Sequence, residues 1–156
     1  MSIKIGVTSF LLIIVLGGTC FPQEQNVDWF VKFDEYSYLS IAKEKERLDK
    51  FVAQLRSQPE WLGYVEVYAG RCTYIREANI RANRVKRYLL ERGIAAQRIV
   101  NIDGGYRENF TVDLWMSPRG APNLPLSPTL KPNEVRIIQR PKKRAACLRN
   151  QKLLRG

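Results

Sequence analysis

The sequence contains no histidine among its 156 residues and only three cysteines. Without histidine the chain cannot build a Ser-His-Asp or Cys-His catalytic relay, nor a zinc or haem site with histidine ligands. Three cysteines cannot supply the four thiolates of an all-cysteine tetrahedral metal site. The chain also lacks a glycine-rich loop of the kind that holds phosphate. An enzyme is therefore the least expected class, and we predict no catalytic residues, no metal and no cofactor.

Long apolar runs are scarce as well. The clearest one, at residues 5–16, follows Lys4 and precedes small residues that end in Cys20. This run is too short for a comfortable membrane span, but it has the three regions of a secretory signal peptide. We therefore predict that residues 1–20 are a signal peptide and that the protein is periplasmic, secreted or otherwise part of the cell envelope.

Cys20 introduces an alternative, because a cysteine at the end of such a segment can carry lipid. Gly17 stands where the lipidation pattern has Leu, Val or Ile, and Thr19 stands where it has Gly, Ala or Ser. These departures favour plain cleavage between residues 19 and 23 over lipidation. Attachment to a membrane would require lipid on Cys20 or retention of the apolar segment.

Export would leave Cys72 and Cys147 as an even pair in an oxidising compartment. A disulfide between them would close a loop of about 75 residues and add about 4 kcal/mol to stability on the chain-entropy model. Two free thiols are the alternative, and the sequence does not decide between these states.

Negative charge is nearly absent from the end of the chain. Residues 126–156 carry nine Lys and Arg against Glu134 alone, whereas residues 21–125 carry 16 Lys and Arg against 14 Asp and Glu. The net charge of +11 therefore belongs mainly to a basic tail. Such a tail predicts salt-dependent binding to anionic polymers or surfaces. The export signal argues against nucleic acid as the physiological partner.

Apolar residues of the central region follow strand-like or helical spacing. Strands are predicted at 28–34, 64–69, 98–102 and 110–115, and helices at 41–55 and 75–89. The order β-α-β-α-β-β predicts an α/β (α+β) sandwich with one mixed sheet and two helices on one face. The loop at 103–109 is compatible with a hairpin between the last two strands. Strand alternation predicts that Glu66, Asp103 and Asp113 face solvent.

These patterns divide the chain into a signal peptide (1–20), a folded domain (27–116), a linker (117–133) and a basic tail (134–156). Five prolines between residues 118 and 132 exclude a helix or a central strand from the linker. Residues 134–138 have the composition of a short additional strand.

The stretch Arg81-Ala-Asn-Arg-Val-Lys-Arg-Tyr-Leu, followed by Arg92-Gly-Ile and Arg98-Ile, resembles the OmpA-like domain. This family is the C-terminal, peptidoglycan-associated module of outer-membrane protein A and related lipoproteins. Its members have an Arg-Ala pair in a helix, followed by Val one helical turn later and Tyr-Leu two turns later. Gly-Ile and Arg-Ile then lead into the next strand. Phe33-Asp34 is similar to its opening Phe-Asp element. The resemblance covers roughly residues 28–116 and implies the β-α-β-α-β-β fold.

The resemblance also implies a site. Members of the family bind the diaminopimelate of peptidoglycan with an Arg, which takes a carboxylate, and an Asp after the second strand, which takes the ammonium group. Arg81 matches the Arg, but Arg71-Cys-Thr stands where the Asp is expected, and the connection to Arg81 is shorter than the family's. The paired arginines that precede the last strand in the family are absent too.

A site with Arg71 and Arg81 but no carboxylate favours an anionic ligand, and Arg107 is a third candidate for it. We therefore predict an exported, non-enzymatic domain that binds peptidoglycan or another anionic envelope component. A protein-interaction or structural module that has lost the peptidoglycan site is one alternative, and binding of anionic polymers through the basic tail is another. If Cys72 and Cys147 pair, the tail would lie beside Arg71.

Overall fold

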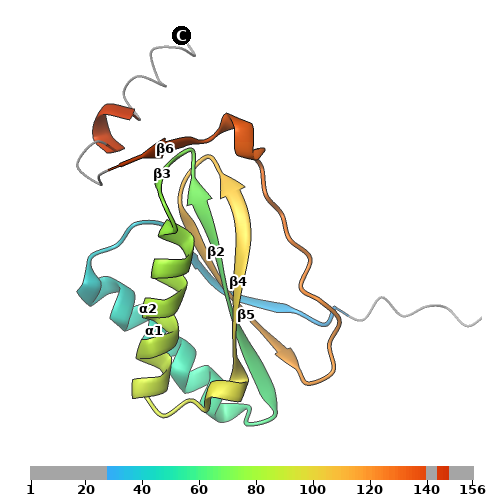
Figure 1. Cartoon of the computed structure of the whole chain (residues 1–156). Coiled ribbons are helices and arrows are strands. Elements are labelled where there is room, and N and C mark those ends of the chain that lie inside the picture. The colour runs from blue at the N-terminus through green and yellow to red at the C-terminus, as the bar shows by residue number, and fades with distance from the viewer. Residues whose placement is uncertain (1–27, 140–143, 148–156) are drawn as a thin grey trace, which may run out of the picture.

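The computed structural model describes residues 28–139 and 144–147. Over these residues the chain forms an α+β domain with a mixed four-stranded sheet, which confirms the predicted mixed sheet (Figure 1). The sheet consists of β1 (Val31–Tyr36), β2 (Trp61–Gly70), β4 (Ile99–Arg107) and β5 (Thr111–Pro118), in the spatial order β1-β5-β2-β4. The predicted signal peptide with Cys20, and most of the basic tail, lie outside the described residues.

Two helices, α1 (Ile41–Ser57) and α2 (Glu77–Glu91), cover the same face of this sheet (Figure 1). The side chain of Ser40 caps α1 by accepting a hydrogen bond from the Lys43 amide, and Gly93 follows the end of α2 with a φ of 81°. The apolar side chains of both helices join those of the strands in one buried cluster. Its fully buried members include Phe51, Leu55, Val65, Val67, Val85, Leu89, Val112 and Leu114.

The predicted hairpin between the last two strands is wrong. β4 pairs in parallel with β2, and β5 pairs antiparallel with the other side of β2, so that β2 separates them. The glycines that suggested a turn form a bulge within β4 instead, where Asp103 faces Val67, Gly105 faces Tyr68 and Gly104 is the extra residue. A Cβ atom on Gly104 would lie 2.5 Å from the Tyr68 ring, so a larger residue at this position would have to displace that ring.

The proline-rich segment after β5 returns along the sheet to a second, two-stranded sheet (Figure 1). On the way, the amides of Thr129 and Leu130 donate hydrogen bonds to the Tyr106 carbonyl at 2.9 and 3.1 Å. A 3-10 turn (η2, Pro132–Glu134) then leads into β6 (Arg136–Ile138), which pairs in parallel with β3 (Cys72–Tyr74). The strand predicted near residues 134–138 therefore forms at 136–138.

The sheet face away from the helices carries polar side chains, and two of its carboxylates are buried. Glu66 and Asp113 lie on this face with exposed fractions of 1% and 0%, so the prediction that they face solvent is wrong, whereas Asp103 is exposed. The proline-rich segment covers this face: the Ser127 amide donates a hydrogen bond to the Tyr68 hydroxyl at 2.9 Å. The segment predicted to be a linker thus contacts the sheet through Ser127.

Candidate functional site

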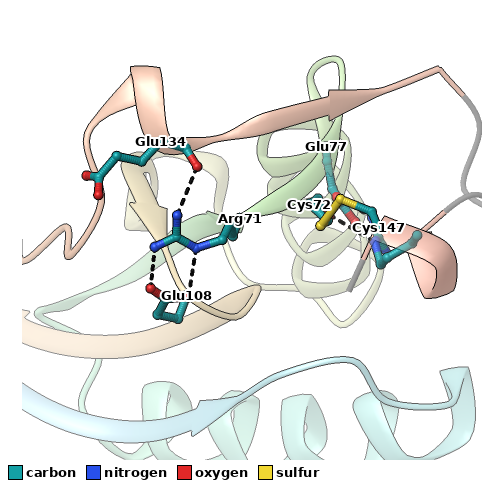
Figure 2. The surroundings of a disulfide bond; sticks show 7 residues. Arg71, Cys72, Glu77, Glu108, Glu134 and Cys147 are labelled. Carbon is teal, nitrogen blue, oxygen red and sulfur yellow. Dashed lines mark hydrogen bonds and ion pairs between the residues drawn. A yellow bond between two sulfur atoms is a disulfide. The ribbon is translucent and has the colours of Figure 1, made fainter. Parts of the chain in front are cut away.

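The first of the three candidate anion-binding arginines, Arg71, is held by groups of its own chain. Its Nε and Nη2 donate to the two carboxylate oxygens of Glu108 at 2.9 and 2.5 Å, and its Nη1 donates to the carbonyl of Glu134 at 3.1 Å. Figure 2 shows the guanidinium group between these two partners. The bidentate pair links the end of β2 to the loop before β5, and the third bond links it to the segment before β6. Arg71 thus joins three segments of its own chain.

Arg107 lies on the polar face of the sheet, remote from the helices. Its guanidinium carbon is 3.5 Å from the centroid of the Tyr68 ring, and its Nη1 is 3.0 Å from Oδ2 of Asp113. A further bond runs from Nη2 to the Ser127 hydroxyl at 2.6 Å. Asp113 is fully buried, and Arg107 supplies a positive charge beside this carboxylate inside the fold.

Glu66 and Asp113 form the acidic part of this polar face. Glu66 accepts hydrogen bonds from the Tyr68 hydroxyl at 2.6 Å and from Nε1 of Trp115 at 3.1 Å. Burial raises the pKa of Glu66 and the pKa of Asp113 above their ordinary values, although Arg107 and Lys32 partly oppose the shift of Asp113. Neither carboxylate is among the residues that line the groove beside β4 described below. Together with Arg107 and Lys32 they form a buried charge network.

The third candidate, Arg81, has a different environment. It lies in the second turn of α2, and its guanidinium carbon is 5.6 Å from the centroid of the Tyr38 ring and 5.7 Å from that of Phe110. These two rings stack at 4.5 Å. The Nε of Arg81 is buried and has no hydrogen-bond partner in the described part of the chain. A buried donor without a partner costs free energy, which the oxygen of a ligand would remove.

A carboxylate that the sequence analysis did not single out lies one helical turn before Arg81. Glu77 is at the start of α2, and its side chain has no solvent exposure. It accepts hydrogen bonds from the Tyr38 hydroxyl at 2.8 Å and from the Thr73 hydroxyl at 2.9 Å, and it forms an ion pair with Arg144. Burial, together with the bond to Glu77, raises the pKa of Tyr38 well above its ordinary range. The spacing of four residues between Glu77 and Arg81 indicates that the two lie on one face of a helix, and the pair Cys72 and Cys147 was the signal that brings the tail near them.

Arg144 belongs to a helical turn at residues 144–147, which we call the arm. The arm is cross-linked to β3 by a disulfide between Cys72 and Cys147, whose Cα atoms are 6.1 Å apart across 75 residues of sequence (Figure 2). The Nε of Arg144 donates to the Cys72 carbonyl at 3.2 Å. Its guanidinium carbon lies 4.4 Å from the centroid of Tyr38. The arm therefore lies against the start of α2, next to the environment of Arg81.

A second feature is a groove of about 610 Å³ between the edge strand β4, the start of α2 and the returning proline-rich segment. Three exposed apolar side chains, Ile75, Leu126 and Ile137, are among the residues that line it, with exposed fractions of 69%, 51% and 52%. Within residues 28–139 and 144–147, no group of acidic or cysteine side chains is arranged to hold a metal ion.

None of the helices in the described part of the chain combines the length and the apolar character needed to cross a membrane. Comparison of the chain with protein-family models and with curated proteins returned no match. In this α+β domain the guanidinium group of Arg81, with its unpartnered buried Nε, lies over a pair of stacked aromatic rings. The Nε of Arg84 is also buried without a partner, but the Nη2 of Arg84 is paired with Glu44.

Proposed function

We propose that this protein is an exported, non-enzymatic domain of the cell envelope, related to the OmpA-like family. Its ligand is a carboxylate-bearing envelope component, peptidoglycan in the first place, and Arg81 binds that carboxylate. Two helices on one face of a mixed sheet, in the order that the resemblance implies, support this proposal. Strand β3 between β2 and α2 is an addition to that order.

The unpartnered Nε of Arg81 carries the proposal. A guanidinium group presents its N–H donors as a planar fork that matches the two oxygens of a carboxylate. Arg71 and Arg107 are left out of the proposed site, because their donors already bind Glu108 and Asp113. The site is therefore smaller than the three-arginine site expected from the sequence.

Co-sedimentation with purified peptidoglycan sacculi tests this proposal. The exported full-length protein is assayed in its oxidised form and after treatment with dithiothreitol. We expect retention in at least one of these states, and a loss of about tenfold or more in the Arg81→Ala variant, since a hydrogen bond to a charged group contributes about 1.5–3 kcal/mol. Arg87→Ala, which removes an exposed cation from the same helix, should leave retention unchanged.

Two results would overturn the proposal. One is the absence of retention in both redox states. The other is equal retention of the Arg81→Ala and Arg87→Ala variants, which would show that sacculi bind the net positive charge of the chain instead of a defined site.

The groove beside β4 favours a second function, binding of another protein in an extended conformation. In the described residues, β4 pairs with β2 on one side, and its outer edge carries a single bridge from Tyr106 to Leu130. That bridge shows that the edge accepts extended chain, as in recognition by strand addition. A partner cross-linked through a photoreactive residue at position 126 should be lost in Ile137→Asp and kept in Arg81→Ala.

A further inference from the structure

The first turn of α2 and the neighbouring β3 enclose a position suited to a cation. Glu77 supplies a fully buried carboxylate, and the Cys72 carbonyl supplies a second acceptor. The rings of Tyr38 and Tyr74 also border this position. Their centroids are 4.4 and 5.4 Å from the guanidinium carbon of Arg144. A buried carboxylate with aromatic faces around it is the arrangement that binds guanidinium and alkylammonium groups.

From this arrangement we propose that Glu77, Tyr38 and Tyr74 form a binding site for a guanidinium or alkylammonium group, and that Arg144 is its internal occupant. Oxidation of Cys72 and Cys147 keeps the site closed. Reduction opens it to an external cation of the same chemistry.

The packing of the arm supports the view that Arg144 is a removable occupant and not part of the core. Cys147 belongs to a small cluster with Cys72, Ile138 and Tyr74, which is separate from the large cluster of the sheet and the helices. Departure of the arm would thus leave the main core intact. Glu77 would then lose the cation that pairs with it, and another cation could take that place.

The disulfide determines how strongly Arg144 competes with an external cation. While the bond is intact, the arm is covalently fixed to β3. A dithiol reductant cleaves it by thiol–disulfide exchange: the S–S bond gains two electrons, Cys72 and Cys147 each gain a proton, and the dithiol becomes a disulfide. Arg144 then remains joined to β6 by the continuous backbone, so that an external cation competes with a tethered group. Reduction therefore converts a closed site into one that an external ligand can enter by competition.

This inference does not depend on the carboxylate ligand proposed for Arg81, because it concerns the opposite charge and different residues. The probe is N-acetyl-L-arginine amide, whose side chain is that of Arg144, and its binding to the full chain is measured by NMR titration. N-acetyl-L-citrulline amide has nearly the same shape without the charge and is the matched control.

We expect saturable binding of the arginine probe to oxidised Arg144→Ala, with a dissociation constant of about 1 mM. Binding to oxidised wild type should be at least tenfold weaker, and reduced wild type and Cys147→Ser should both lie between these limits. The citrulline probe should not bind any of them. Addition of Glu77→Gln or of Tyr74→Leu to Arg144→Ala should weaken binding of the arginine probe at least tenfold.

The proposal is overturned if Arg144→Ala, with the circular dichroism spectrum of the wild type, binds the arginine probe no better than the oxidised wild type does. Equal binding of the citrulline probe, or equal affinity of oxidised and reduced wild type, would overturn it as well. A failure of the sacculus experiment would leave these titrations unaffected, so the two proposals fail separately.

Discussion

Glu66 and Asp113 lie directly opposite each other on β2 and β5, and both carboxylates are excluded from solvent. Two negative charges that are buried next to each other would be unstable without positive charges or hydrogen-bond donors beside them. Arg107 at 3.0 Å and Lys32 at 3.3 Å supply these charges to Asp113, and the hydroxyl of Tyr68 and the indole of Trp115 donate to Glu66. The pair is thus in contact with groups from four strands.

The raised pKa of Glu66 predicts a pH dependence of stability. A carboxyl group with a higher pKa in the folded state than its ordinary value of 4.5 binds a proton more tightly when folded. The stabilisation that this tighter proton binding provides is therefore fully present below pH 4.5. It is lost as the pH rises through the raised pKa of Glu66. The free energy of unfolding of wild type, relative to Glu66→Gln, should decrease over this interval. Urea unfolding at a series of pH values measures it, and a difference that rises with pH would contradict the prediction.

Arg107→Ala should be strongly destabilising. The substitution leaves the buried Asp113 with Lys32 as its remaining cation and removes the guanidinium group from the Tyr68 ring. Loss of one partner of a buried pair typically costs about 3 kcal/mol or more. The matched control is Arg119→Ala, because Arg119 pairs with Glu60 at 3.7 Å on the surface and its loss should cost about 0.5 kcal/mol or less. Equal effects of the two substitutions in urea unfolding would refute the structural role of Arg107.

Local patterns in the sequence were sufficient to predict the two long helices and the four strands of the main sheet. Helical spacing placed α1 and α2 within a few residues of their bounds, because each has an apolar face and a clear end signal, Pro59 for one and Gly93 for the other. The glycines of β4 were misread because a bulge and a turn have the same composition. What distinguishes them is the Tyr68 ring against Gly104, and that contact comes from another strand.

The candidate site was less predictable than the fold. Arg81 was identified through a family resemblance, but the two rings beside its guanidinium group, Tyr38 and Phe110, come from two distant segments of the chain. Glu77 and Arg144 are separated by 67 residues, and no local pattern brings them together. The burial of Glu66 and Asp113 was missed for a related reason: the segment that covers them is rich in proline and has no periodicity that would mark an apolar face.

Arg98 predicts a further stability effect, because it satisfies the carboxyl-terminal end of α1. Its Nη2 donates to the carbonyls of Leu55 and Gln58 at 2.7 and 2.8 Å, and its Nε donates to that of Trp61 at 2.9 Å. Carbonyls at a helix end lack partners within the helix, and a cation there also interacts favourably with the helix dipole. Arg98→Ala should therefore lower the free energy of unfolding by about 2 kcal/mol.

The control for Arg98 is Lys50→Ala on α1, which removes an exposed pair with Glu46 and should cost about 0.5 kcal/mol or less. Arg98→Lys should recover only part of the loss, since one ammonium group lacks the fork that reaches three carbonyls. A loss for Arg98→Ala no larger than that of the control would contradict the capping role.

Gly104→Ala tests whether the β4 bulge depends on close contact with Tyr68. The φ of Gly104 is not in the left-handed region, so an alanine is not excluded by the backbone. The obstacle is space: the added Cβ would lie 2.5 Å from the Tyr68 ring, which is fully buried and bonded through its hydroxyl to Glu66 and Ser127. Overpacking of this kind lowers the free energy of unfolding by about 1–3 kcal/mol. We expect the upper part of that range, because the backbone and the two hydrogen bonds of the hydroxyl restrict movement of the Tyr68 ring.

Gly120→Ala separates this steric effect from backbone strain. Gly120 has a φ of 83° and no heavy atom within 4 Å of an added Cβ, so its substitution measures the left-handed conformation alone, at a cost of about 1–2 kcal/mol. Only Gly104→Ala should also disturb the environment of Tyr68, which a change in its ring resonances by NMR would report. If Gly104→Ala leaves both stability and those resonances unchanged, the ring has room to move and the bulge is not what orients Glu66.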